Sequence, residues 1–93
     1  MATFAATYAY ASGKEAERDT HRSEHKDFLA GLHADGILRV SGPLDGGNRA
    51  LLVLEGSSSE EVASLLDRDP FHRHGLIGER TIAEWSIVFG SLR

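Results

Sequence analysis

The chain has five histidines, and His25 has the most informative position for proton-transfer chemistry. His25 lies a helical step before Phe28 and Leu29, so a helix here places the three side chains on one apolar face. Imidazole takes up and releases a proton near physiological pH, which makes such a histidine a candidate general acid or base. A histidine at the edge of the core, hydrogen-bonded to backbone, would have the same pattern. Both interpretations stay open at this point.

Asp69 and Arg22 are further candidates for a catalytic or binding role, and each also has a structural explanation. Asp69 stands directly before Pro70, where a carboxylate caps a following helical turn by accepting backbone N–H groups. A carboxylate can accept from several donors, so capping leaves room for a second role. Arg22 follows Asp19 by three residues and suits either a surface ion pair or recognition of an anionic group.

A metal or cofactor site is not expected. His21 and His25 are four residues apart and share a helix face, but the intervening residues do not match the metalloprotease helix motif. His72 and His74 could add ligands, yet no feature of the sequence brings them near. The absence of cysteine excludes cysteine-ligated zinc, iron–sulfur clusters and a cysteine nucleophile. We therefore predict no metal requirement and no cofactor.

Composition describes a small soluble domain. The 93 residues are 41% hydrophobic and 26% charged, which is ordinary for one globular domain spanning residues 1–93. The net charge is −4 and no Lys/Arg run occurs, which argues against a nucleic-acid partner. No stretch approaches the roughly 20 apolar residues that cross a bilayer. We expect a cytoplasmic protein without a membrane partner.

Hydrophobic periodicity predicts four strands and two main helices. We expect Gly36 to take a left-handed helix cap, and pairs with capping-box spacing, Ser12 with Glu15 and Ser58 with Glu61, to open the helices. The predicted elements are strand 4–11, helix 14–33, strand 37–40 closed by Ser41-Gly42-Pro43, strand 51–55, a helix from 58 to Asp69-Pro70, a turn or single helical turn over 71–76, and strand 79–89.

The last predicted strand has Trp85, Ile87 and Phe89 in alternation, with Ile82 out of phase and an irregularity expected near residues 83–84. Trp85, Phe71 and Tyr8 are expected mainly in the core, with a pocket wall as the alternative.

The order β-α-β-β-α-β predicts an α+β, ferredoxin-like fold with two helices on one face of a four-stranded antiparallel sheet. The opposite face would be uncovered and is not clearly polar. We therefore predict a homodimer in which two such sheets pack against each other.

Several segments, in their order and spacing, make the chain similar to the YciI-like (YCII-related) family of the dimeric α+β barrel superfamily. They are Arg22-Ser-Glu-His25 with Phe28-Leu29, Asp35-Gly36-Ile37-Leu38, Ser41-Gly42-Pro43-Leu44, Ser-Ser-Glu-Glu at 58–61, Asp69-Pro70-Phe71 with Gly75-Leu76, and the last strand through Ile82 and Trp85.

The resemblance implies a His–Asp site in a pocket beside the sheet, formed here by His25 and Asp69 as catalytic residues. Asp69 would orient the imidazole and stabilise its cation. Arg22 would bind an anionic substrate group. Ser41, at a strand end near the pocket mouth, is the second candidate for substrate binding, although turn chemistry explains it equally well.

Two functions are consistent with these residues. One is a cofactor-free lyase or isomerase acting on a small, anionic, partly apolar molecule. The other is a non-catalytic homodimeric module that binds a small ligand or a partner protein. A hydrogen bond between His25 and Asp69 beside an accessible cavity would favour the first.

Overall fold

The computed structural model describes residues 1–92 and has the predicted ferredoxin-like order of elements. The elements are β1 (Ala2–Tyr10), α1 (Glu15–Ala34), β2 (Leu38–Leu44), a short 3₁₀ helix η1 (Asp45–Gly47), β3 (Arg49–Gly56), α2 (Ser59–Leu66), α3 (Pro70–Arg73) and β4 (Ile77–Glu84). The four-residue helix α3 confirms the single helical turn expected after Pro70.

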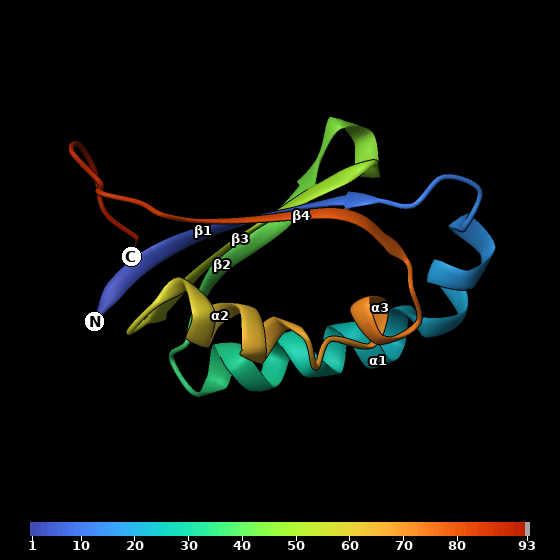
Figure 1. The fold of residues 1–93 in the computed structure, drawn as a ribbon, viewed down its shortest axis with the longest axis horizontal. Coiled ribbons are helices and arrows are strands. Elements are labelled where there is room, and N and C mark those ends of the chain that lie inside the picture. The colour runs from blue at the N-terminus through green and yellow to red at the C-terminus, as the bar shows by residue number, and fades with distance from the viewer. Residues whose placement is uncertain (93) are drawn as a thin grey trace.

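The strands form one antiparallel sheet in the order β2-β3-β1-β4, and the three helices lie on one of its faces (Figure 1). Even-numbered residues of β1 point toward the helices, as the period-2 pattern predicts. The core between sheet and helices contains Phe4, Ala6 and Tyr8 of β1, Leu52 and Leu54 of β3, Leu32 of α1, Leu38 of β2, and Val62 and Leu66 of α2.

Strand β2 continues past the point where the sequence predicted its end. Ser41, Gly42 and Pro43 remain paired with β3, and Pro43 lies opposite Ala50. The prediction that these residues close the strand is wrong. β2 lies at the edge of the sheet, and an edge strand tolerates proline because the backbone on one side needs no donor.

The two predicted capping boxes have different outcomes. Ser58 caps α2 by accepting the backbone N–H of Glu61 at 3.1 Å. Helix α1 begins after Lys14 and has no side-chain cap, so the prediction for Ser12 is wrong. Gly13, at a φ of +74°, extends the turn that follows β1 and starts the helix beyond the reach of Ser12. Gly36, at +77°, confirms the predicted left-handed conformation after α1.

The last strand is shorter than predicted and ends at Glu84. Ile82 packs against the core, and the chain leaves the regular pattern after residue 84, close to the expected irregularity. Trp85 is 41% exposed and Phe89 93% exposed. The alternation of apolar residues that predicted a strand to residue 89 therefore does not mark a buried strand face. The expected core role of Trp85 is wrong for the same reason.

The sheet face opposite the helices, here called the outer face, has an apolar hollow of about 310 Å³. Its lining includes Ala5, Leu51, Ala83 and Trp85. Residues 85–92 then lead back toward β2, where Arg39 donates a hydrogen bond to the carbonyl of Leu92 at 2.9 Å. Within residues 1–92, no helix has the length and apolar character needed to cross a membrane.

Candidate active site: a histidine and a buried carboxylate beside a pocket

Asp69 caps helix α3, as the Asp-Pro sequence predicts. Its Oδ1 accepts the backbone N–H of Phe71 at 2.9 Å, and Pro70 occupies the start of the helix. Asp69 has no exposed surface, although most aspartates stay in contact with water. A carboxylate buried this deeply needs donors for both of its oxygens.

Two further donors come from distant parts of the chain. His25 Nδ1 lies 2.8 Å from Asp69 Oδ1, and the Tyr8 hydroxyl donates to Asp69 Oδ2 at 3.0 Å. Tyr8 comes from β1 and His25 from the buried face of α1. The Asp69 carboxylate, at the start of α3, therefore links the sheet to α1 and α3. The expected pairing of His25 with Asp69 is therefore present in the structure.

The acceptor character of the carboxylate defines the orientation of the imidazole. An ionised carboxylate can only accept a hydrogen bond, so the 2.8 Å contact favours the tautomer with the proton on Nδ1 and the lone pair on Nε2. The ring of His25 also stacks on Phe71, with 3.9 Å between ring centroids and 3° between planes. Hydrogen bond and stacking together fix the imidazole, as catalysis by a positioned base requires.

The tyrosines beside Asp69 remain protonated over a wide pH range. Burial, followed by the negative charge of Asp69, raises the pKa of Tyr8 well above its ordinary value of 10.0. The same two causes raise the pKa of Tyr10. Tyr8 therefore serves as a hydrogen-bond donor to Asp69 at neutral pH.

A pocket of about 380 Å³ opens on the side of His25. Tyr8, Tyr10 and Phe71 contribute aromatic walls, and Leu29 and Leu52 are also part of the lining. The volume suits a ligand of about one ring, at the low end of the range for small-molecule sites. Tyr8 and Phe71 thus belong both to the buried interior and to the pocket, whereas Trp85 lies outside the pocket lining.

Arg22 and Ser41, the two candidate substrate-binding residues, both line this pocket. Arg22 comes from α1 and Ser41 from β2, so the fold brings them to one cavity. Arg22 Nη2 also donates to Asp19 at 2.8 Å in an exposed ion pair, the structural alternative considered for it. Lys26, one helical turn after Arg22, adds a second cation to the lining.

Sequence analysis missed the bond from Tyr8 to Asp69 and the cation Lys26. Tyr8 was placed in the period-2 pattern of β1, but nothing in that pattern shows what its hydroxyl contacts. Lys26 lies four residues after Arg22, a spacing that places both on one helix face. That spacing was the available signal for Lys26.

The family model of the YCII-related domain matches residues 2–86. The chain belongs to the YCII-related family. The uncharacterised protein YjpA of Bacillus subtilis (strain 168) is 34% identical to this chain over 67 residues, which are 72% of this chain and 78% of YjpA.

Solved structures share the fold. The 5-chloro-2-hydroxyhydroquinone dehydrochlorinase TftG from Burkholderia phenoliruptrix AC1100, in complex with 2,5-dihydroxybenzoquinone, is similar with a TM-score of 0.80 and 25% identity. This match covers 90% of the present chain and 93% of TftG. A NIPSNAP family protein from Agrobacterium tumefaciens is similar in fold alone, with a TM-score of 0.58 and 19% identity over 98% of this chain and 97% of its own.

Proposed function

We propose that this YCII-related protein is a cofactor-free lyase or isomerase that acts on a small, anionic and partly apolar molecule. The observation that carries the proposal is the 2.8 Å contact between His25 Nδ1 and Asp69 Oδ1 at the wall of the pocket. This contact leaves Nε2 of His25 as the proton acceptor. Asp69 then stabilises the imidazolium that proton uptake creates.

The proposed step requires only proton transfer by the protein. Nε2 of His25 removes a proton from the substrate, and the electron pair of the broken bond forms a new double bond. In a lyase reaction this expels a leaving group together with its bonding pair. In an isomerase reaction the imidazolium returns the proton to another atom. Such a positioned base contributes about 10²–10⁴-fold to the rate.

The pocket lining supports the proposed substrate class. Arg22 and Lys26 supply positive charge for an anionic oxygen, while Tyr10 and Phe71 offer apolar ring faces. A hydroxylated benzene or benzoquinone ring with ionised oxygens combines the two properties. The compounds named for TftG, 5-chloro-2-hydroxyhydroquinone and 2,5-dihydroxybenzoquinone, belong to this class and are the first probes to use.

The test measures chloride release from 5-chloro-2-hydroxyhydroquinone and binding of 2,5-dihydroxybenzoquinone. We expect the wild-type protein to do both, and His25→Asn to lose about 10²-fold or more of the chloride release while still binding the quinone. His72→Asn, which alters an exposed histidine of α3, is the matched control and should retain activity. Binding without turnover, unchanged in His25→Asn, would instead support a non-catalytic small-ligand module.

We also propose that the protein is a homodimer through its outer sheet faces. Several large apolar side chains are exposed: Val40 of β2, and Trp85, Val88 and Phe89 of the C-terminal segment. The apolar hollow beside Leu51 lies on the same sheet face as Ala5 and Ala83. A second copy of this face would cover surface that a monomer leaves in water. Light scattering at micromolar concentration tests this, and a monomer mass alone would refute it.

A further inference from the structure

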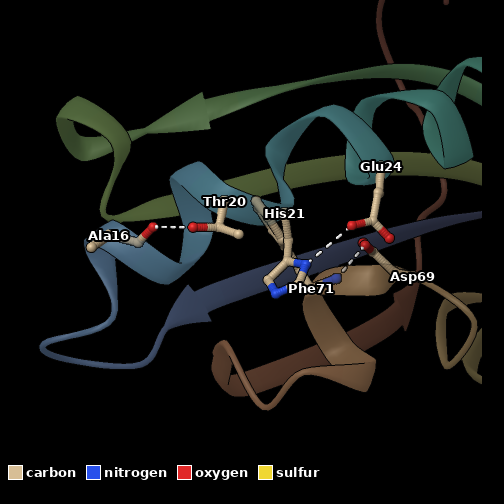
Figure 2. A network of polar contacts seen from close by, with 6 residues as sticks. All are labelled: Ala16, Thr20, His21, Glu24, Asp69 and Phe71. Carbon is tan, nitrogen blue, oxygen red and sulfur yellow. Dashed lines mark hydrogen bonds and ion pairs between the residues drawn. The ribbon is translucent and has the colours of Figure 1, made fainter.

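Two histidines and a glutamate meet where α1 contacts the segment after α3, outside the lining of the pocket. They are His21 and Glu24 of α1 and His74, the residue that ends α3. One potential ligand atom from each lies within 4.8 Å of the other two. Figure 2 shows His21 joined to the Glu24 carboxylate on the face of α1 that meets the segment of Asp69 and Phe71.

The packing of α3 on α1 creates this cluster. His25 stacks on Phe71, and His21, one helical turn earlier, stacks on His74 with 3.7 Å between ring centroids. Phe71 and His74 are three residues apart, and His21 and His25 are four apart, so each pair lies on one face of its helix. The sequence alone offers no reason for this contact, because His74 and His21 are separated by 53 positions.

We propose that His21, Glu24 and His74 form a binding site for a divalent cation of the zinc class. Two neutral imidazole nitrogens and one carboxylate oxygen are a ligand set that Zn²⁺ prefers, and hard cations such as Mg²⁺ do not. The set leaves a fourth tetrahedral position for water. The site lies apart from the His25–Asp69 pair and does not depend on the function proposed for that pair.

Binding requires the stacked side chains of His21 and His74 to rearrange. The two rings are within 15° of parallel, and parallel stacked rings cannot direct their lone pairs at one point. Tetrahedral ligands about 2.0–2.2 Å from zinc are roughly 3.3 Å from one another, so the present separations must close. His74 and Glu24 are exposed and His21 is half-buried, so rotation of the outer side chains meets little obstruction.

An ion bound here would join α1 to the end of α3. It would therefore hold the segment that positions Asp69 against His25. Because the ion binds the folded chain and the unfolded chain lacks this arrangement, it adds to the free energy of unfolding in proportion to the logarithm of its concentration. The proposed effect of the ion is to stabilise the fold, and the ion is removable by a chelator.

The test uses the full chain without a histidine tag, freed of metal by chelation and titrated with ZnCl₂ near neutral pH. Calorimetry should report one zinc per chain with micromolar or tighter affinity. His21→Ala and His74→Ala should each weaken binding at least about tenfold, and Glu24→Gln should weaken it also. His72→Ala, a matched exposed histidine of the same helix, should bind zinc as the wild type does.

The imidazole NMR spectrum of the wild-type chain checks the ligands without any substitution. Zinc should move the ring signals of His21 and His74 and leave those of His72 unchanged. Absence of stoichiometric binding, or equal affinity in the wild type, His21→Ala and His74→Ala, would overturn the proposal. Loss of zinc in His25→Asn with retention in His74→Ala would overturn the ligand set.

Discussion

Oδ1 of Asp69 lies 2.8 Å from Nδ1 of His25 and 2.9 Å from the backbone nitrogen of Phe71. The same oxygen therefore caps α3 and orients the imidazole. The two interpretations of Asp69 that the sequence left open are not alternatives, because one atom serves both. Capping fixes the carboxylate at the start of α3, and the fixed carboxylate then selects the tautomer of His25.

Two substitutions of Asp69 separate its charge from its cap. Asp69→Asn keeps an oxygen for the Phe71 N–H but makes the hydrogen bonds from His25 and Tyr8 neutral, so we expect it to lower the free energy of unfolding by about 1–2 kcal/mol. Turnover of the aromatic probe should fall about 10²–10⁴-fold, because the neutral amide cannot stabilise the imidazolium. Asp69→Ala removes the cap as well and leaves the Tyr8 hydroxyl without its acceptor, at a cost of about 3 kcal/mol or more. Urea unfolding and a rate assay on both variants check this, and equal stability of the two would contradict it.

Tyr8 makes the stability of the fold sensitive to alkaline pH. Its pKa is raised in the folded chain, so the unfolded chain loses the phenolic proton first as pH rises. The contribution of Tyr8 is complete below pH 10 and declines above it by about 1.4 kcal/mol per pH unit. Tyr10, whose pKa is raised as well, adds to the decline.

Tyr8→Phe should weaken the fold at neutral pH by about 1.5–3 kcal/mol, the range for a hydrogen bond to a charged group. Tyr8→Phe should also make the free energy of unfolding fall less steeply at alkaline pH, because only Tyr10 then contributes to the fall. Urea unfolding between about pH 9 and 11 measures this slope. Tyr10→Phe, in which the bond from Tyr8 to Asp69 is kept, is the control for the neutral-pH loss. An unchanged alkaline slope in Tyr8→Phe would contradict the account.

Two glycines should respond to alanine in opposite directions. Gly31 lies inside α1 with open space at its Cβ position, and Gly31→Ala should stabilise the fold by about 0.5–1 kcal/mol. A Cβ at Gly56 would lie 2.8 Å from Cγ2 of Val62, so Gly56→Ala should cost about 1–3 kcal/mol. Thermal unfolding of the pair checks the packing of α2 on β3. A Gly56→Ala chain as stable as the wild type would show that Val62 of α2 does not pack closely against Gly56 of β3.

The proposed dimer predicts a specific response at the outer face. Leu51→Lys places a charge in the apolar hollow and should shift the mass in sedimentation toward the monomer. Ser64→Lys, on the exposed side of α2, adds the same charge on the helical layer and should leave the mass unchanged. If both variants sediment as the wild type does, the interface lies elsewhere.

Local patterns predicted those parts of the fold that depend on local physics. The period-2 aromatics of β1, the apolar face of α1 around His25 and the Asp-Pro start of α3 all form as predicted, because each is determined by neighbouring residues. The cap at Ser12 and the end of β2 at Ser41 were wrong. At Ser12 a neighbouring residue outweighs the capping signal, because Gly13 extends the turn; at Ser41 tertiary context does so, because the pairing of β2 with β3 continues across a proline.

The site was predictable only in part for a similar reason. Family resemblance supplied the pairing of His25 with Asp69, and helical phase placed His25 on the buried face. The third member, Tyr8, was out of reach because its hydroxyl contacts a residue 61 positions away. Recognising that contact requires knowing that β1 occupies an interior place in the sheet, beneath α3.

The proposed role of His25 as the base depends on which of its ring nitrogens carries the proton. A ¹⁵N NMR spectrum that correlates ring nitrogens with ring protons, recorded where the imidazole is neutral, distinguishes protonated from unprotonated nitrogens. We expect Nδ1 to carry the proton, directed at Asp69, and Nε2 to be unprotonated. Addition of 2,5-dihydroxybenzoquinone should then shift the Nε2 signal more than that of Nδ1. A proton found on Nε2, with Nδ1 bare, would contradict the account, because the nitrogen proposed as the base would have no lone pair to offer.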